Sequence, residues 1–395
     1  MIDVRKAVEE LTPEITVMRN HIHENPELSL KYNTCAYLED WVKKNVIYDR
    51  LSRVGETGLF FELKGTKPGK GKTIVFRGDI DALPIQEEPS NVPCSKVPGV
   101  MHACGHDVHG TINVGAAKIL SRMKDQFAGS IYFFIQPAEE VLVGAKLFLN
   151  DPEIDFDKID DVAALHVSAE IDAGTIGVRY GAILASADEF CIKVIGKGGH
   201  GAHCHTVKDP VVAASAIVMG LQTLVSRETN PANSVVVSTC MIHGGAAQNI
   251  IPDEVELRGT VRTLSHEDRA RVEKSLFRVA EHVAEAYGCR AEVEYSHGVP
   301  PFVCEDEWVD RAVRVGKKML GDENLIIMPH AAMGAEDFSF IKEKKPGIFI
   351  RLGARTPGGA YGSAHSSSFY CDPKALPTGM LTIIGLAADY FGFEV

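Results

Sequence analysis

Residues 130–140 of the chain read SIYFFIQPAEE, and this stretch decides the fold. An unbroken apolar run that stops at a polar turn is typical of a strand buried on both faces of a sheet. Similar runs predict strands at residues 58–63, 73–76 and 162–165, and apolar side chains at helical spacing predict a helix at 107–124. Because strands here alternate with helices, this half of the chain is predicted to be α/β, with a mostly parallel sheet covered on both faces.

Polar residues follow the carboxyl ends of these predicted strands. Asp79 and Asp81 come after the strand at 73–76, and Glu139 and Glu140 come directly after the run at 130–135. His166 follows the short strand that ends at residue 165. Open α/β sheets place their sites at the carboxyl ends of strands. We therefore expect these side chains to share one site.

The pattern changes between residues 185 and 297. The expected elements there are a strand at 189–195, a helix at 210–227, strands at 234–242 and 254–262, a helix at 266–287 and a strand at 291–295. This β-α-β-β-α-β order is that of a ferredoxin-like unit. Strands at 325–328 and 347–352 and a helix near 378–390 then resume the α/β pattern. We predict a catalytic metal-binding domain at 1–184 and 298–395, and an inserted α+β domain at 185–297.

Length and composition limit the class of protein. A chain of 395 residues suggests about two domains. The net charge of -12, with 53 acidic and 41 basic side chains, argues against a nucleic-acid partner. The charged N-terminus lacks the apolar run of a signal peptide, and no apolar stretch reaches the ~20 residues that span a bilayer. Nine cysteines without a C-x-x-C pair favour free thiols and a cytoplasmic protein without a membrane partner.

The strongest local signal is HACGHDVH at residues 102–109. A cysteine and histidines this close, before a helix, suit zinc, manganese, cobalt or nickel, although a buried cysteine beside surface histidines has the same pattern. Glu139 and Glu140 are able to divide the roles of metal ligand and proton carrier, or to form an ordinary solvated loop. His166 and His365 are each weak signals when taken alone. What favours a metal site is that all these ligand types stand at strand ends or in loops beside them.

A second motif, GKGGHG at residues 196–201, matches the dinucleotide-binding pattern G-x-G-x-x-G. Its context argues against a nucleotide site, because His200, His203 and His205 crowd the place where a phosphate-binding helix should begin. The next predicted helix starts only near residue 210. A histidine-bearing loop that reaches toward another domain fits better.

Several segments together resemble one known family. They are HIHENPE at 21–27, RGDIDALP at 77–84, HACGHD at 102–107, QPAEE at 136–140, GGHGA at 198–202 and MGAEDF at 333–338. In this order they resemble the aminoacylase/hippurate-hydrolase family of metallopeptidase-like amidohydrolases, which includes the plant auxin-conjugate hydrolases. The resemblance covers nearly the whole chain, from residue 21 to the region of His365.

The resemblance implies a catalytic domain that holds two divalent metal ions, with manganese, zinc, cobalt and nickel left open. The implied metal ligands are Cys104, His106, Glu140, His166 and His365. Glu139 is the implied general acid/base, and Asp81 is implied to orient a ligand.

The resemblance also implies that the inserted domain is a lid and that it forms a homodimer or higher homo-oligomer. His200 is implied to support the oxyanion, in some relatives from the partner subunit. Asn249 and Arg262 resemble lid residues that bind the substrate's carboxylate, although an exposed arginine paired with a local acid is the plain alternative for Arg262.

Two positions depart from the family pattern. Cys204 stands where the lid motif usually has proline, and Ser366-Ser367 follows His365 where the family usually has Ser-Pro. We expect altered loop shape and substrate preference at these positions, with hydrolysis retained.

The predicted activity is metal-dependent hydrolysis of an N-acyl-L-amino acid, a small molecule, to a carboxylate and a free amino acid. The alternatives are an N-acetyl-diaminopimelate-type deacetylase of lysine biosynthesis, a dipeptidase or carboxypeptidase, and a metal- or peptide-binding module without catalysis. A nicotinamide-dependent oxidoreductase would rest on residues 196–201 alone.

Overall fold

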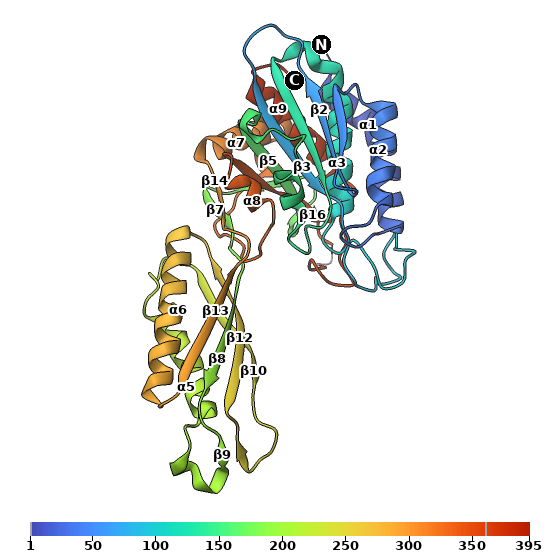
Figure 1. The fold of residues 1–395 in the computed structure, drawn as a ribbon. Coiled ribbons are helices and arrows are strands. Elements are labelled where there is room, and N and C mark those ends of the chain that lie inside the picture. Colours follow the sequence, from blue (N-terminus) through green and yellow to red (C-terminus); the bar gives the residue numbers. More distant parts are fainter. Residues whose placement is uncertain (1, 360–361) are drawn as a thin grey trace. The chain divides into compact units, whose positions relative to one another are not determined.

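The computed structural model describes residues 2–359 and 362–395 and divides into two compact units (Figure 1). The first unit contains the chain up to Gly181 together with Cys304–His330 and Phe340–Val395. The second unit contains Ala182–Val303 and Ala331–Ser339.

An eight-stranded sheet forms the centre of the first unit. Its strands are, in spatial order, β1 (Arg50–Val54), β2 (Gly58–Lys64), β4 (Gly129–Gln136), β3 (Lys72–Asp79), β5 (Asp161–Asp172), β16 (Gly347–Arg355), β6 (Ile176–Val178) and β15 (Leu325–Ile327). The central strands β4, β3, β5 and β16 run parallel. β1 and β2 are antiparallel additions at one edge, and β6 is antiparallel to β16. The predicted α/β fold with a mostly parallel sheet is confirmed.

Helices of the first unit cover this sheet. They are α1 (Val4–Glu24), α2 (Asn33–Asn45), α3 (His106–Leu120), α4 (Gly144–Leu149), α7 (Asp306–Leu320), α8 (Ser339–Lys342) and α9 (Ala375–Phe391). The helix α3 is buried along nearly its whole length, including polar side chains such as His106 and His109. It contacts β3, β4 and β5 on one side and α1 and α9 on the other. The helix predicted at 107–124 therefore exists, and its last turns are a 3-10 helix at Ser121–Gln126.

The strand predicted at residues 162–165 is longer than expected. β5 continues to Asp172, because β16 pairs with it in parallel well beyond residue 165. His166 therefore lies inside a strand, and the expectation that it follows a strand end was wrong. β3 pairs with β5 only as far as Arg77 and Ala164, so His166 is level with Asp79, where β3 ends. The register of the sheet thus brings His166 to the predicted edge after all.

The second unit is built around a four-stranded antiparallel sheet. Its elements are β8 (Asp188–Ile195), α5 (Pro210–Ser226), β10 (Val235–His243), β12 (Glu254–Thr263), α6 (His266–Ala286) and β13 (Arg290–His297), and the strand order is β10-β12-β8-β13. Two caps explain where its helices begin: the Asp209 side chain accepts from the Val211 amide, and Ser265 accepts from the Asp268 amide. This order and connectivity are ferredoxin-like, as predicted.

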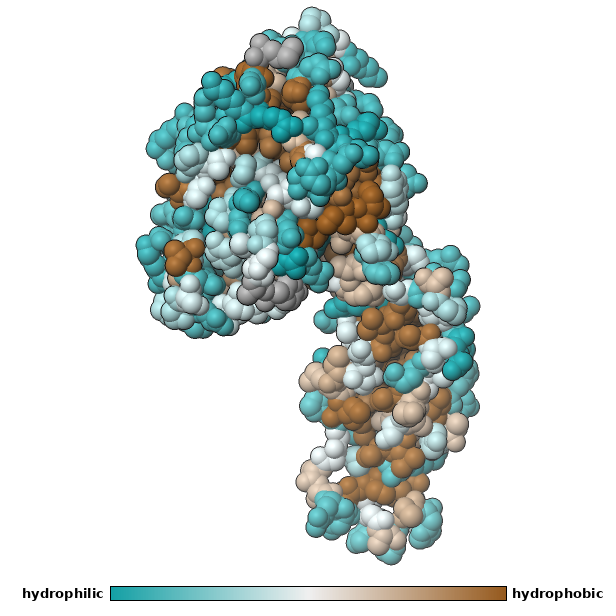
Figure 2. Space-filling model, turned by 180° about the vertical axis from the view of Figure 1, so that it is seen from behind, coloured by the Kyte–Doolittle hydropathy of each residue, from teal (hydrophilic) through white to brown (hydrophobic). Residues whose placement is uncertain are grey.

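Four short strands form two separate two-stranded sheets. β7 (Gly181–Leu184) pairs with β14 (Phe302–Cys304), and β9 (Gly199–His200) pairs with β11 (Ile250–Ile251). Figure 2 shows apolar side chains gathered over part of the second unit. Among residues 2–359 and 362–395, no helix has both the length and the apolar character needed to cross a membrane.

Candidate metal centre

The turn that begins α3 carries two of the predicted metal ligands, Cys104 and His106. Gly105 lies between them, with a φ of 81° in the left-handed region that favours glycine. A Cβ atom at this position would lie 2.3 Å from Cγ2 of Val167 on β5. Glycine therefore lets the turn approach β5 closely enough to bring Cys104 to His166, whose Nε2 lies 3.4 Å from the Cys104 sulfur.

Asp81 joins the end of β3 to the turn that follows β4. Its Oδ1 accepts from the Glu139 amide and its Oδ2 from the Glu140 amide, each at 3.1 Å. Its Oδ1 also lies 3.2 Å from Nδ1 of His106. A carboxylate accepts only, so Nδ1 donates to it and Nε2 faces the opposite way, which is the arrangement of a metal-binding histidine with an orienting carboxylate.

Two buried atoms at this centre need a partner. Nε2 of His106 and Oε1 of Glu140 are 3.7 Å apart, and within the described part of the chain neither has a hydrogen-bond partner. Leaving such an atom unsatisfied costs about 1–3 kcal/mol. Together with the Cys104 sulfur these atoms lie within 4.8 Å of one another. A thiol, an imidazole and a carboxylate converging in this way fit a divalent first-row metal ion.

The pKa values around this cluster agree with a cation site. Burial raises the pKa of the Cys104 thiol to about 12 and also raises the pKa of Glu140. Burial opposes the charged form of His106, but the Asp79 carboxylate nevertheless raises the pKa of His106 well above its usual value. A divalent ion would displace the protons from the thiol and from Nε2, so its binding releases protons.

The remaining predicted ligand, His365, lies beside Glu140. Its Nε2 is 3.6 Å from Glu140 Oε2, and its side chain is 55% exposed. Its amide donates to the Ala103 carbonyl at 2.8 Å, which fixes this loop against the turn before α3. The structure therefore gathers all five predicted ligands, with Glu139 buried next to them along the chain.

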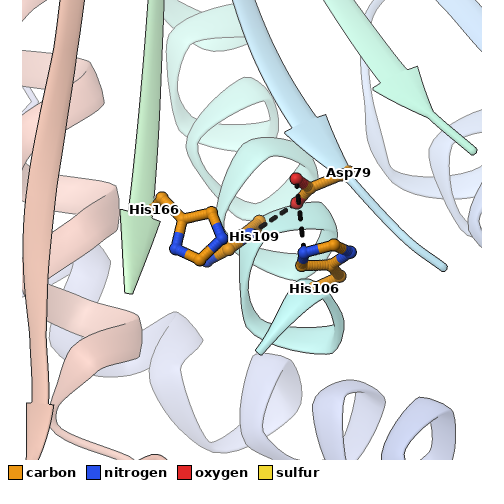
Figure 3. A group of neighbouring side chains, drawn as sticks. All are labelled: Asp79, His106, His109 and His166. Atoms are coloured by element: carbon orange, nitrogen blue, oxygen red, sulfur yellow. Dashed lines mark hydrogen bonds and ion pairs between the residues drawn. The ribbon is translucent and has the colours of Figure 1, made fainter. Parts of the chain in front are cut away.

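A second group of ligand-type side chains lies directly beside the first (Figure 3): Asp79, His106, His109 and His166. Asp79 is engaged on both oxygens, by Arg77 Nη1 at 2.5 Å and by His109 Nδ1 at 2.5 Å. Nε2 of His109 accepts the Val167 amide at 2.8 Å. Because its one acceptor lone pair is occupied, His109 is a poorer ligand than Cys104 or Glu140, and Asp79 is already engaged by two donors.

His109 received no role from its motif, and Asp79 was expected only to share the site. The signal for His109 was its position three residues after His106, which puts both on one side of a helix. Burial lowers the pKa of His109, and the charges of Arg77 and the neighbouring histidines hold the pKa of Asp79 well below its usual value despite burial. These groups form a neutral imidazole held by an ionised carboxylate.

The three predicted residues of the second unit do not form one cluster. His200 and Asn249 lie together, since β9 pairs with β11 and the Gly201 amide donates to the Asn249 carbonyl at 2.9 Å. Arg262 lies near the end of β12, whose first residue, Glu254, pairs with Ile195 shortly before β9. Arg262 is eight residue steps from Glu254 along the strand, about 27 Å at ~3.4 Å per step. The Arg262 guanidinium contacts the Thr260 hydroxyl and the Val261 carbonyl.

Comparisons with known proteins agree with this picture. The profile of peptidase family M20/M25/M40 matches residues 75–389. The N-acetyl-L-cysteine deacetylase of Bacillus subtilis is 37% identical over 97% of this chain and 88% of its own length. Thermostable carboxypeptidase 2 of Saccharolobus solfataricus is 34% identical over 98% of both chains. The crystal structure of Bacillus subtilis YxeP, described as a dinuclear metal-binding peptidase from the M20 family, superposes with a TM-score of 0.85 at 31% identity, covering 98% of this chain and 100% of that one.

The fold, the cluster and these relatives define the class of the protein, a hydrolase that acts on amide bonds. Within that class, the chain belongs to peptidase family M20/M25/M40, so the predicted membership of this amidohydrolase family is confirmed. The match excludes a nicotinamide-dependent oxidoreductase. Consistent with this, the loop after the G-x-G-x-x-G segment is a 3-10 helix, and α5 begins only at Pro210.

Proposed function

We propose that the chain hydrolyses N-acyl-L-amino acids to a carboxylate and a free amino acid. The observation that carries the proposal is a pair of buried atoms on His106 and Glu140 that have no hydrogen-bond partner among the described residues, beside Cys104 and next to Glu139. An N-acetyl-L-cysteine deacetylase among the relatives has an N-acyl amino acid as its named substrate. The cytoplasm stays the expected compartment.

Cys104, His106, Glu140, His166 and His365 would hold two divalent ions, with manganese, zinc, cobalt and nickel as the candidates. When bound, such ions polarise the amide carbonyl and lower the pKa of a water molecule. Glu139 takes a proton from the attacking water while the oxygen of that water forms a bond to the carbonyl carbon. As the C–N bond breaks, Glu139 gives that proton to the leaving nitrogen, so the products are a carboxylate and an amine.

Asp81 fixes the geometry of this exchange. It accepts both the Glu139 and the Glu140 amides, so one carboxylate sets the positions of the proton carrier and of a ligand. It also orients His106 through Nδ1. The backbone at Glu139 and Glu140 and the ring of His106 are therefore held before substrate arrives, which lowers the entropic cost of the reaction.

The second unit would act as a lid and as the dimerisation domain. Asn249 and Arg262 would bind the substrate's carboxylate, and His200 would support the oxyanion. Glu254 and Arg262 lie about 27 Å apart along β12, and His200 lies beyond the Glu254 end of that strand. His200 and Arg262 of one second unit therefore cannot reach the same small substrate. We infer that one of the two acts on the partner subunit's substrate, so the active protein is a homodimer.

Release of free amino acid from a panel of substrates tests the proposal. The panel contains N-acetyl, aromatic acyl and N-acetyl-diaminopimelate substrates and plain dipeptides. Metal-loaded wild type should hydrolyse N-acyl amino acids, and chelator-stripped protein should not. Glu139→Gln should lose about 10²- to 10⁴-fold in kcat. Glu170→Gln, an exposed site on β5, is the matched control and should keep full activity. A fully active Glu139→Gln protein would overturn the assigned role.

A carboxypeptidase or dipeptidase is the second candidate, favoured by the carboxypeptidase among the relatives. The same panel separates the two. Cleavage of dipeptides without cleavage of N-acetyl or aromatic acyl substrates would select this candidate. A preference for N-acetyl-diaminopimelate would select the deacetylase of lysine biosynthesis.

A further inference from the structure

His109 is a fully buried histidine that the proposed reaction does not use. It lies on α3, three residues after His106, and touches β3 through Asp79 and β5 through Val167. We propose that His109 is a positioning residue, which ties the Val167 amide to Asp79 and so holds the neighbouring His166 where it binds metal. This inference rests on the proposed two-metal function.

The need for such a residue comes from the register of the sheet. β5 is paired with β3 only as far as Ala164, whereas β16 continues along its other side. Beyond Ala164, the backbone groups of β5 that face β3 have no strand partner among the described residues. The Val167 N–H donates instead to Nε2 of His109 at 2.8 Å, so a helix side chain takes the place of the missing strand.

The backbone of Val167 links the two histidines. Its carbonyl lies 2.7 Å from Nδ1 of His166, which donates to it and leaves Nε2 of His166 facing Cys104. Its amide, in the peptide bond that joins it to His166, is fixed by His109. The backbone on both sides of Val167 is therefore determined, and the direction of the His166 ring follows from it.

The hydrogen bonds of His109 also define its protonation. Nε2 accepts an amide N–H, so its lone pair is occupied, and Nδ1 faces a carboxylate oxygen, so it carries the hydrogen. A neutral ring in this tautomer has no free lone pair for a metal ion. Asp79 is in turn held by Arg77, which in addition donates to Gln136 at 3.0 Å. His109 is thus held at the end of β3 by Asp79, which Arg77 fixes in turn.

The alternative role for His109 is that of a metal ligand, because it belongs to a group of four ligand-type side chains. The two roles predict different effects of substitution. A ligand would be lost in any variant without an imidazole. A positioning residue is replaceable by any side chain that both donates to Asp79 and accepts from Val167.

Three variants separate these roles, with cobalt(II) as the probe. His109→Asn keeps a donor for Asp79 but is too short to reach Val167. His109→Gln is one methylene longer, and its amide offers a donor and an acceptor to the same two partners. Asn113→Ala removes another buried polar group of α3 and is the control for general loss of stability. Binding is followed by dialysis and by the thiolate-to-cobalt absorption of Cys104, neither of which requires activity.

Wild type should bind two cobalt ions. In His109→Asn, the more weakly bound of the two cobalt ions should bind about 10- to 100-fold less tightly than in wild type, as is typical when a group that orients a ligand is removed. His109→Gln should recover most of that loss, and Asn113→Ala should bind both ions as wild type does. Wild-type affinity in His109→Asn, or equal losses in the asparagine and glutamine variants, would overturn the positioning role. A wild type that binds no cobalt would overturn the proposed function itself.

Discussion

Replacing Gly105 by alanine should be costly for two separable reasons. The backbone φ of 81° is left-handed, and an alanine there loses about 1–2 kcal/mol relative to a right-handed conformation. The new Cβ would also lie 2.3 Å from Val167 Cγ2, and overpacking of a buried site costs about 1–3 kcal/mol. The expected loss of unfolding free energy is therefore about 2–5 kcal/mol.

Gly99→Ala isolates the backbone contribution. Gly99 has a similar φ of 74°, but nothing lies within 4 Å of a Cβ built on it. It should lose only about 1–2 kcal/mol. The double variant Gly105→Ala with Val167→Ala removes the clashing methyl group, so its loss should be smaller than the sum of the two single losses.

Tryptophan fluorescence during urea unfolding is the suitable assay. The only two tryptophans of the sequence, Trp41 and Trp308, both belong to the first unit, so the signal follows that unit alone. Measurements on chelator-treated protein exclude a contribution from metal binding. Equal losses for Gly105→Ala and Gly99→Ala would refute the reasoning, because the contact with Val167 would then have no energetic effect.

Two further predictions concern buried ion pairs between side chains of the first unit. Burial opposes the charge of His23, but the carboxylates of Asp107 at 2.8 Å and Glu87 at 2.9 Å raise the pKa of His23 above its usual value. The ion pairs of protonated His23 therefore stabilise the folded protein below about pH 6.5, and this contribution to the unfolding free energy is lost as pH rises through the raised pKa. His23→Gln should remove this fall in urea midpoint, and an unchanged pH dependence would contradict the assignment. Arg77→Leu leaves the buried Asp79 carboxylate without its main counter-ion and should lower the unfolding free energy by about 3–5 kcal/mol, measured by the same fluorescence assay. A loss below about 1 kcal/mol would show that Asp79 takes up a proton instead.

The buried strands were predictable because their apolar runs are unbroken. The run at 130–135 lies within β4 at Gly129–Gln136, and all of its residues are buried. The ferredoxin-like order was predictable from the sequence of strand and helix patterns between residues 185 and 297. No helix or strand was predicted before residue 58, where α1 and α2 lie. α1 contains Pro13 in its interior, a residue that usually ends a helix, and its burial becomes evident only through contacts with α3 and α9.

For the site, the residue types were predictable and their relations were not. Cys104, His106 and Glu140 stand in short motifs beside predicted strands, so their chemistry was visible. That His166 belongs with them depends on where β3 stops along β5, which no local pattern records. The role of His109 depends on the Val167 amide, a backbone group that sequence motifs do not describe.

The position of β16 constrains how the chain can fold as it is synthesised. β5 and β6 are separated by only three residues, yet β16, which follows the whole second unit along the chain, lies between them. Until residues 347–355 leave the ribosome, β5 has an unpaired edge that is free to pair wrongly with β6 or with another chain. The second unit is nearly continuous in sequence and has its own core, so it can fold during this interval. A nascent chain that stops before β16 carries four of the five predicted ligands on an open sheet, which makes it a natural client for a chaperone.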